Sequence, residues 1–580
     1  MKKLILVGVN AKYIHSNLAI RCLKQNCNHV KNWDVEIYEI TINDILDNSA
    51  LQLFDLDGDA YGFSCYIWNF DRIIKLAEII KKSKPEATII LGGPEVTYNP
   101  LSILESYWFI DYILSGEGEE LLPKLLLNLD NIQNQYIELS SIYGQNNQNK
   151  SLLNPASVQD LTVLPFPYTC DDIQQLKDKI IYYESMRGCP FQCSYCLSSI
   201  LIHVRYQNLE RTLLELDQFI ENKVRQVKFV DRTFNVNQKR AKHIFRHLIS
   251  SDTKTNFHFE MSADLMDEEM LEIIKMAPKG RFQFEIGIQS TAQSTLDAIT
   301  RRTSLSLAQK HTKQLLEFQN CHIHLDLIAG LPYETYDVFR RSFNETIMLR
   351  PHMLQLGFLK LLQGTRIRLE AKKYNYKYEN FPPYEIISND FISYKELGFL
   401  KILESLVDMY YNSEKFKNTL EYLFGCMCWE TEFDFFEDFS NWWKNQGCHK
   451  FSHSLDGLYN QLNMFLKKMQ VNLQLVNDLL KYDYLLQGQR TLPNFFENSM
   501  LDSKLAFHIL NQEEFIANNF LELVPLTSKT RMKKVTFQKF KIETQAYFSS
   551  TSEVCIFFEG NAIFVPQSIL QQFNPKPFLN

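Results

Sequence analysis

The feature that most constrains the fold of this 580-residue chain is a succession of short apolar runs separated by helical patterns. Up to residue 130 the runs are almost continuously apolar, as in strands that are buried on both faces of a parallel sheet. They are KLILVGV (3–9), VEIYEI (35–40), AYGFSCYIW (60–68), ATIILGG (87–93) and FIDYILSG (109–116). Amphipathic patterns such as FDRIIKLAEIIKKS lie between them. The pattern predicts a Rossmann-like α/β domain over residues 1–135.

A second alternation of strands and helices follows a stretch rich in Asn, Gln, Ser and Pro, which predicts a linker over residues 136–175. Six strand-like runs then appear between residues 176 and 368. They are KIIYYESM (179–186), RQVKFVD (225–231), TNFHFEMS (255–262), GRFQFEIGIQS (280–290), CHIHLDLIAG (321–330) and HMLQLGFLKLL (352–362). Six successive β/α units predict a partial (β/α)6 TIM barrel, whose functional residues lie where the strands end.

The alternation stops near residue 369, and residues 369–580 are predicted to form a mostly helical accessory domain. Strands are expected only near the end of this range. They are VTFQKF (535–540), AYFSS (546–550) and VCIFFEGNAIFVP (554–566).

Composition excludes several classes of protein. A net charge of −7 argues against a nucleic-acid partner, because such partners require a basic surface. No apolar run reaches the length of a membrane helix, so no membrane partner is expected. Twelve cysteines in a long chain without a secretory signal predict reduced thiols and a cytoplasmic location.

The segment ESMRGCPFQCSYCLSS brings three cysteines within eight positions: Cys189, Cys193 and Cys196. Thiolates are preferred ligands of soft metals and of iron–sulfur clusters. A structural zinc site is the alternative, and it would need a fourth ligand such as His203. No second CxxC pair is present to close such a shell. Three thiolates on a four-iron cluster leave one iron open for a small molecule, so we interpret the three cysteines as catalytic metal ligands.

The octapeptide CPFQCSYC, with its aromatic Tyr195, resembles the CxxxCxxC motif of radical S-adenosylmethionine (SAM) enzymes. The resemblance implies a 4Fe-4S cluster held by the three cysteines. It also implies that the open iron binds SAM, which one electron cleaves to methionine and a 5′-deoxyadenosyl radical.

Further segments after the cysteines resemble the SAM-binding positions of this family. Gln289 closes EIGIQS, Arg301 lies in the helix behind it, and Asp326 lies in HLDLIAGLP. The resemblance implies that Arg301 binds the SAM carboxylate and that Asp326 binds the ribose, and Glu260 is a further candidate. The segment VDRTFN replaces a glycine-rich turn, which is typical of radical SAM enzymes that also bind cobalamin.

The N-terminal domain has no GxGxxG, so nicotinamide or flavin binding is unsupported. It resembles cobalamin-binding domains instead. The candidate cofactor-binding residues are His15, Ser64, Gly92, Gly93 and Gly116. His15 is a candidate lower ligand of cobalt, although Tyr13 and Leu18 stand where the family pattern has aspartate and glycine. Gly116 lies in SGEGEE, a turn that either faces the ring or caps the next helix.

The order of domains resembles the class B cobalamin-dependent radical SAM enzymes with a C-terminal domain of unknown function. This implies three cofactors, a 4Fe-4S cluster, SAM and cobalamin, and methylation of an unactivated carbon in a small-molecule or peptide substrate. A reductant such as flavodoxin or ferredoxin is the expected partner. Two alternatives stay open: a non-methylating enzyme such as a porphyrin-type oxidative cyclase, and a non-catalytic iron–sulfur or cobalamin sensor. An auxiliary metal site at Cys426 and Cys428 with Cys448, His449 and His453 is a further, weaker hypothesis.

Overall fold

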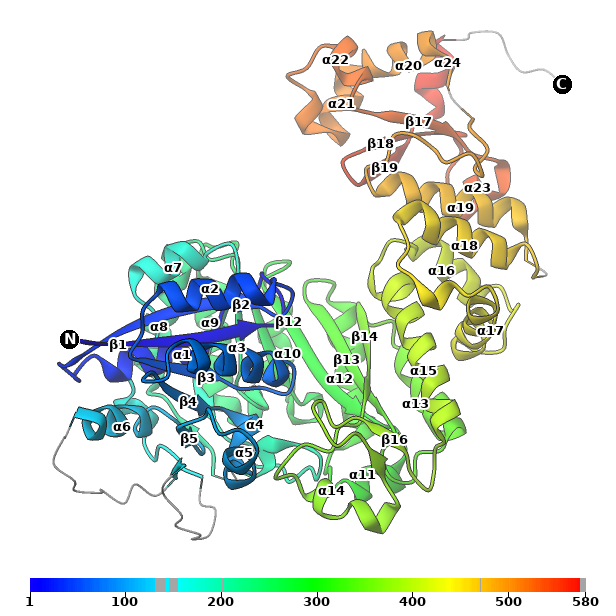
Figure 1. The fold of residues 1–580 in the computed structure, drawn as a ribbon. Helices are drawn as coiled ribbons and strands as arrows, with labels where there is room; N and C mark the ends of the chain where they lie inside the picture. The colour runs from blue at the N-terminus through cyan, green and yellow to red at the C-terminus, as the bar shows by residue number, and fades with distance from the viewer. Residues whose placement is uncertain (131–140, 146–154, 201–202, 470, 500, 574–580) are drawn as a thin grey trace. The chain divides into compact units, whose positions relative to one another are not determined.

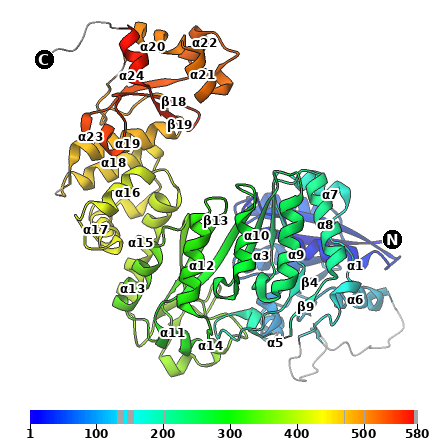
Figure 2. The same cartoon turned by 180° about the vertical axis from the view of Figure 1, so that it is seen from behind.

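The computed structural model describes residues 1–130, 141–145, 155–200, 203–469, 471–499 and 501–573. These residues form two compact units. The first comprises Met1–Pro351 and Gln355–Leu397, and the second comprises His352–Leu354 and Gly398–Asn580. Figures 1 and 2 show their elements from two sides. Among the helices of the described ranges, none combines the length and the apolar character that crossing a membrane requires.

The first sheet has six strands in the order β2-β1-β3-β4-β5-β6. They are β1 (Lys2–Asn10), β2 (Trp33–Thr41), β3 (Ala60–Ser64), β4 (Thr88–Gly92), β5 (Tyr112–Leu114) and β6 (Ile142–Gly144). The pairs from β2 to β5 are parallel, whereas β6 runs antiparallel to β5. Strand β6 falls within residues 136–175, so part of the predicted linker contributes to the edge of this sheet.

Helices cover both faces of the first sheet because its strands are apolar on both sides. Ile5 and Val7 of β1 face a core formed with α2, α3 and α5, whereas Leu4 and Leu6 face a core formed with α1 and α6. These helices are α1 (Leu18–Cys27), α2 (Leu46–Asp55), α3 (Phe70–Ser83), α5 (Pro100–Ser106) and α6 (Leu121–Asp130); the short α4 (Pro94–Thr97) follows β4. Each fully buried aliphatic side chain contributes about 1.5–3 kcal/mol to stability.

The second sheet of the first unit has the order β14-β13-β12-β11-β10-β7. Its strands are β7 (Ile180–Tyr183), β10 (Gln226–Phe229), β11 (Asn256–Met261), β12 (Phe282–Gln289), β13 (His322–Ala329) and β14 (Met353–Phe358). The pairs from β7 to β13 are parallel. All six predicted strands are present, and the parallel sheet confirms the predicted α/β class.

Helices lie along the outer face of the second sheet, and Figure 2 shows α8, α9, α10 and α12 side by side. The helices are α8 (Leu209–Glu221), α9 (Gln238–Ser250), α10 (Glu268–Lys275), α11 (Gln293–Ala298), α12 (Leu305–Glu317) and α13 (Tyr336–Ile347). Phenylalanines fill the outer core: Phe245 of α9 packs within 6 Å of the rings of Phe259, Phe282 and Phe284. The opposite face of the same strands is polar.

Short elements complete the first unit. Strands β8 (Met186–Arg187) and β9 (Arg205–Tyr206) form a small antiparallel ladder on either side of the cysteine segment. The remaining elements are α7 (Cys170–Leu176), α14 (Arg366–Leu369), β15 (Lys377–Tyr378) and β16 (Ile386–Ser388). The predicted boundary after residue 368 therefore lies inside the first unit, and helix α15 (Tyr394–Leu406) contains the boundary between the two units.

The second unit is mostly helical, as predicted. Its helices are α16 (Lys417–Gly425), α17 (Glu432–Asn445), α18 (Leu455–Leu466), α19 (Leu473–Leu486), α20 (Ser503–Leu510), α21 (Glu513–Asn519), α22 (Ser528–Met532), α23 (Ile542–Tyr547) and α24 (Gln567–Phe573). Strands β17 (Thr536–Lys539), β18 (Val554–Phe558) and β19 (Asn561–Phe564) form an antiparallel sheet. The strand predicted for AYFSS is wrong. Ala546 and Tyr547 end helix α23 because Lys541 and Thr544 are held by the buried carboxylate of Asp478.

Candidate functional site

The three cysteines of the CxxxCxxC segment lie in a loop that is closed at its base by β8 and β9. Gly188, directly before Cys189, has a φ of 96°, a left-handed conformation that favours glycine. Cys189 and Cys193 are buried and Cys196 is half-buried. None of the three forms a disulfide.

Distant parts of the chain fix this loop. The Ser194 N–H donates to the carbonyl of Ile299 at 2.8 Å, and the Ile367 N–H donates to the carbonyl of Ser194 at 2.9 Å. The guanidinium of Arg301 lies 3.7 Å from the sulfur of Cys193 and 3.5 Å from the hydroxyl of Tyr195. Although burial raises the pKa of Cys193, the charge of Arg301 opposes that shift, so it favours the thiolate that binds metal.

The carboxyl end of β12 meets the same guanidinium. Arg301 was predicted to lie in a helix, but it lies between the end of α11 at Ala298 and the start of α12 at Leu305. It also donates to the carbonyl of Gly287. Gln289, which ends β12, has a φ of 70°, a strained conformation for a residue with a side chain. A Cβ on Gly287 would lie 2.1 Å from the amide nitrogen of Gln289, so the Gln289 side chain folds back over this glycine. Strained backbone of this kind is concentrated at functional sites.

Asp326 lies beside Gly287 in the sheet, since the two residues are paired across β12 and β13. Its carboxyl is buried, and one of its oxygens has no hydrogen-bond partner. Burial raises the pKa of Asp326 well above its usual range, and the negative charges of Glu285 and Glu260 add to the shift. A buried polar atom without a partner is costly, so this oxygen is suited to a polar ligand group.

A charged group lies deeper on the same polar face. The Lys228 ammonium lies 3.0 Å from Glu285, and the His258 imidazole lies 3.1 Å from the same carboxylate. Burial opposes ionisation of Glu285, but these two contacts hold its pKa well below the usual range. Within this group the Glu285 carboxylate raises the pKa of Asp326 beyond the larger effect of burial, whereas the Lys228 ammonium opposes that shift.

The segment VDRTFN lies at the end of β10. Asp231 is fully buried and accepts hydrogen bonds from the Ser185 N–H at 2.7 Å and the Ser185 hydroxyl at 2.5 Å. Burial raises the pKa of Asp231 to about 7. Arg232 forms an ion pair with Glu260, and Thr233 lies 3.6 Å from the sulfur of Cys189. The segment thus connects the cysteine loop to the predicted position of Glu260.

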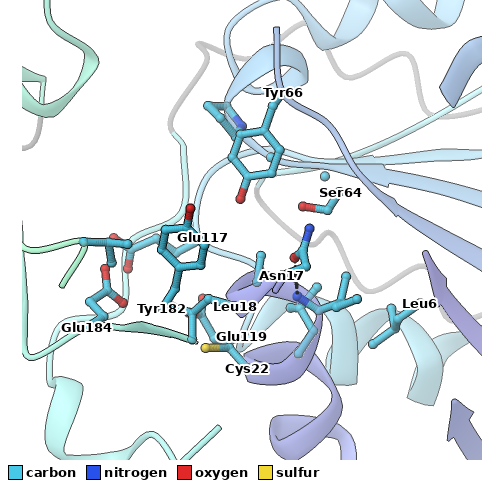
Figure 3. A pocket seen from close by; sticks show the side chains of 18 of the residues that line it. Leu6, Asn17, Leu18, Cys22, Ser64, Tyr66, Glu117, Glu119, Tyr182 and Glu184 are labelled. Carbon is cyan, nitrogen blue, oxygen red and sulfur yellow. Dashed lines mark hydrogen bonds between the residues drawn. The ribbon is translucent and has the colours of Figure 1, made fainter. Parts of the chain in front are cut away.

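A cavity of about 710 Å³ lies between the strand ends of the two sheets. Figure 3 shows labelled side chains gathered around it, among them Ser64 at the end of β3 and Tyr182 of β7, with Tyr66 and Glu184 just beyond these strands. Six of the predicted cofactor residues line it: His15, Ser64, Gly92, Gly93, Gly116 and Glu260. The cavity has the size of a large organic ligand site.

Three of the glycines that line this cavity were predicted to bind a cofactor, and they differ in how much room a side chain would have. A Cβ on Gly93 (φ 112°) would lie 2.5 Å from the carbonyl oxygen of Cys65, and one on Gly116 (φ 97°) would lie 2.4 Å from the backbone of Ala156. A Cβ on Gly92 would meet only ordinary contacts, with the nearest atom at 3.8 Å. Gly93 and Gly116 therefore have no room for a side chain, because the neighbouring backbone packs against them. Gly92 has room for one.

His15 lines the cavity with one ring nitrogen already engaged. Its Nδ1 lies 2.8 Å from the hydroxyl of Tyr182. Burial lowers the pKa of His15, and the charges of Lys12 and Lys228 add to this effect, so the imidazole is neutral near pH 7. A neutral imidazole whose ring is oriented by a hydrogen bond is the form that binds metals, and the hydroxyl of Tyr182 provides such a bond to His15.

An ion-pair network that the sequence did not predict joins the two halves of the first unit. Arg187 lies 3.1 Å from Glu117, 2.8 Å from Glu119 and 2.6 Å from Glu184. Arg205 of β9 lies 2.7 Å from Glu117. Although burial opposes its charge, Glu184 and Glu119 hold the pKa of Arg187 above its usual range. Ion pairs therefore connect the SGEGEE turn to the base of the cysteine loop. The only sequence signal for this network was an arginine, Arg187, directly before Gly188 and Cys189.

The candidate auxiliary metal residues are not arranged as one site in the described residues. Cys448 is buried, and its carbonyl lies 2.9 Å from the imidazole of His453, while Cys428 is exposed. His203, the fourth ligand of the zinc alternative, has an exposed side chain. Within the described part of the chain, no group of three His, Cys, Asp or Glu side chains is placed to share a single metal ion.

A cysteine loop beside a parallel sheet, in one unit with a Rossmann-like domain and next to Arg187, which lines their shared cavity, is the arrangement expected of a cobalamin-type radical SAM protein. Comparison with known families agrees. Residues 4–126 match the B12 binding domain, residues 183–345 match the Radical SAM superfamily, and residues 372–558 match a protein family of unknown function, DUF4080. The predicted class, its three cofactors and its C-terminal domain of unknown function are confirmed by these matches.

Three curated relatives each match about half of the chain or more. The chain is 26% identical over 326 residues to 2-(S-pantetheinyl)-carbapenam-3-carboxylate methyltransferase of Streptantibioticus cattleyicolor, covering 51% of this chain and 46% of that protein. It is 25% identical to the cobalamin-dependent radical SAM methyltransferase TokK of Streptomyces tokunonensis, covering 52% and 47%. The chain thus spans about half the length of these relatives. Anaerobic magnesium-protoporphyrin IX monomethyl ester cyclase of Rubrivivax gelatinosus is 20% identical, covering 68% and 75%.

Solved structures share the fold. The cobalamin-dependent SAM radical enzyme OxsB has a TM-score of 0.57 at 14% identity, covering 84% of this chain and 79% of that one. The radical SAM methyltransferase TsrM of Kitasatospora setae has a TM-score of 0.54 at 15% identity, covering 64% and 76%. At these identities the likeness concerns the fold alone.

Proposed function

We propose that this chain is a cobalamin-dependent radical SAM methyltransferase that methylates an unactivated carbon. The observation that carries the proposal is the shared cavity. Glycines and Ser64 from the first sheet line it together with Tyr182, Arg232 and Glu260 from the barrel. The cysteine loop begins two residues after Arg187, which also lines this cavity, so a radical made at the loop and a methyl donor bound by the first sheet would lie near one substrate position.

The residues present fit the three cofactors. Cys189, Cys193 and Cys196 would hold the cluster, because a buried loop with three thiols and a nearby guanidinium suits a thiolate-bound cluster. Arg301 would bind the SAM carboxylate, and the buried Asp326 carboxyl, with its unpartnered oxygen, would bind the ribose hydroxyls. When bound, the cluster and SAM supply the radical, the corrinoid supplies the methyl group, and a reductant of the flavodoxin or ferredoxin class supplies the electrons.

The first sheet would hold the corrinoid through backbone approach and small polar groups. The close-packed backbone at Gly93 and Gly116 leaves the wall of the cavity flat enough for a large ring. Ser64 would donate a hydrogen bond, and His15 would face the metal with the ring nitrogen that Tyr182 does not contact. Apolar residues dominate the remaining wall, which excludes water from a reactive intermediate.

The test uses the full chain, reconstituted anaerobically with iron, sulfide and hydroxocobalamin, then given reductant and SAM with a deuterated methyl group. We expect 5′-deoxyadenosine and a deuterated methyl group on the corrinoid. Cys193→Ala should abolish 5′-deoxyadenosine, whereas Cys170→Ser, which changes an exposed cysteine far from the loop in sequence, should leave it unchanged.

Each alternative predicts a different outcome of the same assay. An oxidative cyclase would form 5′-deoxyadenosine but transfer no label to the corrinoid. A sensor would bind the corrinoid and the cluster but form no 5′-deoxyadenosine. Either result would overturn the methyltransferase proposal.

A further inference from the structure

We infer that an exposed basic strip, formed by Arg366, Lys372 and Lys373, is the docking surface for a small acidic protein that delivers one electron at a time. The strip lies on α14 and on the 3-10 turn η5 (Ala371–Tyr374), in the same unit as the cysteine loop. The inference rests on the proposed function, because it gives a place on this chain to the reductant that this function requires. It uses none of the residues assigned to the three cofactors.

The first observation is a concentration of positive charge. Between residues 366 and 377 the chain carries five cations and one carboxylate, although its net charge is −7. Arg366, Lys372 and Lys373 are all exposed. The carboxylate, Glu370, lies 2.7 Å from Arg366 and 3.9 Å from Lys373, so it holds these two side chains on one surface. Three cations around one carboxylate leave the strip positive.

Another arginine of α14, Arg368, anchors the strip. Its guanidinium lies 5.1 Å from the ring centre of Tyr378 and 4.6 Å from that of Tyr384. It also donates a hydrogen bond to the carbonyl of Leu361. These contacts fix the base of the strip, so a partner that docks on it does not have to order a loose segment, which would weaken binding.

The second observation is direct contact between this segment and the cysteine loop. The Ile367 N–H donates to the carbonyl of Ser194 at 2.9 Å, and Ser194 directly follows Cys193. The Arg366 guanidinium lies 3.4 Å from the hydroxyl of Thr300, which directly precedes the arginine beside the Cys193 sulfur. Helix α14 also lies beside α11 in both views (Figures 1 and 2). A carrier docked on the strip would therefore lie close to the cluster that the cysteines would hold.

The third observation is an exposed apolar side chain within the strip. Leu369 lies between Arg366 and Lys372 in the sequence, and it is 82% exposed. Interfaces of electron-transfer complexes are small, and a protein interface combines an apolar centre with a polar rim. The cations would attract an acidic partner over a distance, and Leu369 would supply a short-range contact.

The charge of the strip determines the kind of partner. Flavodoxins and ferredoxins are small, acidic one-electron carriers, so their surfaces complement the strip. Complementary charges speed up the encounter of two proteins and orient them. In each transfer the reduced carrier loses one electron and the cluster gains it, and no proton or leaving group crosses the interface.

The experiment measures the binding of oxidised flavodoxin and, separately, of oxidised ferredoxin to the reconstituted full chain by biolayer interferometry at low salt. We expect at least one carrier to bind. Lys372→Gln/Lys373→Gln should raise its Kd about 3–10-fold, because two exposed charge pairs are lost. Lys533→Gln/Lys534→Gln is the matched control, because it removes two neighbouring exposed lysines of the second unit, and it should change the Kd less than about twofold. High salt should abolish the difference.

A rate measurement separates docking from catalysis. With the reduced carrier at concentrations below its Kd, Lys372→Gln/Lys373→Gln should form 5′-deoxyadenosine about 3–10-fold more slowly than the wild type, in proportion to the Kd. With dithionite, which needs no docking surface, the two rates should be equal. If dithionite yields no 5′-deoxyadenosine in the wild type, the proposed function fails, and the binding comparison still decides the docking surface.

Three results would overturn the docking surface. One is a wild-type chain that binds neither carrier, including a chain that binds an RNA oligonucleotide instead. The second is an unchanged Kd in Lys372→Gln/Lys373→Gln. The third is an equal loss of binding in the two double variants, because the attraction would then depend on total charge and not on the strip.

Discussion

The two parallel sheets of the first unit present different chemistry, although both are covered by helices. In the first sheet, β1 and β3 are buried almost without interruption. In the second sheet, β12 and β13 alternate between buried and partly exposed residues along their whole length. These two central strands of the first sheet therefore offer functional groups only at their ends, whereas the second sheet also offers polar side chains such as Lys228, Glu285 and Asp326 along one face.

This difference suggests a division of roles. A sheet without polar side chains on its faces recognises a large ligand through glycines and close backbone approach at its edge. A sheet with a polar face positions charges around a reacting group. Substitutions in the first sheet should therefore weaken ligand binding through steric clashes and altered backbone conformation. Substitutions in the second sheet should weaken it through lost charges.

The largest expected effect lies where the two sheets meet, at Arg187. Arg187→Gln leaves the carboxylates of Glu117, Glu119 and Glu184 clustered without their cation. Removing one member of a buried ion pair costs about 3–5 kcal/mol, and we expect a loss of unfolding free energy in this range in urea titrations. Lys124→Gln removes an exposed partner of Glu120 and should cost less than about 0.5 kcal/mol. Equal effects of the two variants would contradict a structural role for the network.

A pair of neighbouring glycines tests the first sheet. Gly93→Ala forces a left-handed alanine against the backbone of Cys65 and should cost at least about 2 kcal/mol of unfolding free energy. Gly92→Ala meets no such contact, so it should change stability by less than about 1 kcal/mol but weaken corrinoid binding. Both quantities are accessible from urea titration and from corrinoid absorbance after gel filtration. If Gly92→Ala binds the corrinoid as tightly as the wild type, Gly92 does not face the ligand.

Two neighbouring arginines, Arg301 and Arg302, test the proposed SAM site beside the second sheet. Arg301→Gln removes a charged hydrogen-bond donor worth about 1.5–3 kcal/mol, so the Kd for SAM should rise about 10–100-fold. The iron content should stay that of the wild type, because the three thiols are intact. Arg302→Gln changes an exposed side chain and should leave the Kd unchanged. Isothermal titration under anaerobic conditions measures both values, and an unchanged Kd for Arg301→Gln would remove Arg301 from the SAM site.

The smallest effect concerns pH and Asp231. Its pKa of about 7 in the folded protein exceeds the ordinary value of about 3.9, so between these values the folded state binds more protons than the unfolded state. Stability therefore falls as pH rises through this range and levels off above the folded pKa. Between pH 6 and pH 8 the wild type should lose about 1.4 kcal/mol more than Asp231→Asn. An identical pH dependence of the two proteins would show that Asp231 is ionised when folded.

Sequence alone predicted the elements that depend on local pattern. All strands from β1 to β5 and all six strands of the second sheet fall in apolar or alternating runs, and the cysteine spacing identified the loop. Elements set by distant contacts were not predicted. Strand β6 and the ladder of β8 with β9 have three or two residues each, which is too short for a periodic signal.

The ion pairs and hydrogen bonds of the site could not be predicted from the sequence either. Arg187 reaches Glu117 and Glu119 across about seventy positions of sequence, and no local pattern specifies that contact. The hydrogen bond between His15 and Tyr182 also joins the two sheets. By contrast, a family resemblance singled out Arg301 as a ligand of the SAM carboxylate, a role that stays a prediction, and its guanidinium lies 3.7 Å from the sulfur of Cys193.

The central claim is that the three thiols hold a cluster with one iron left for SAM. Electron paramagnetic resonance of the reduced, reconstituted protein, recorded with and without SAM, tests it most directly. We predict that SAM changes the g values of the cluster in the wild type and in Arg302→Gln. A reduced cluster whose spectrum is the same at saturating SAM would contradict the account.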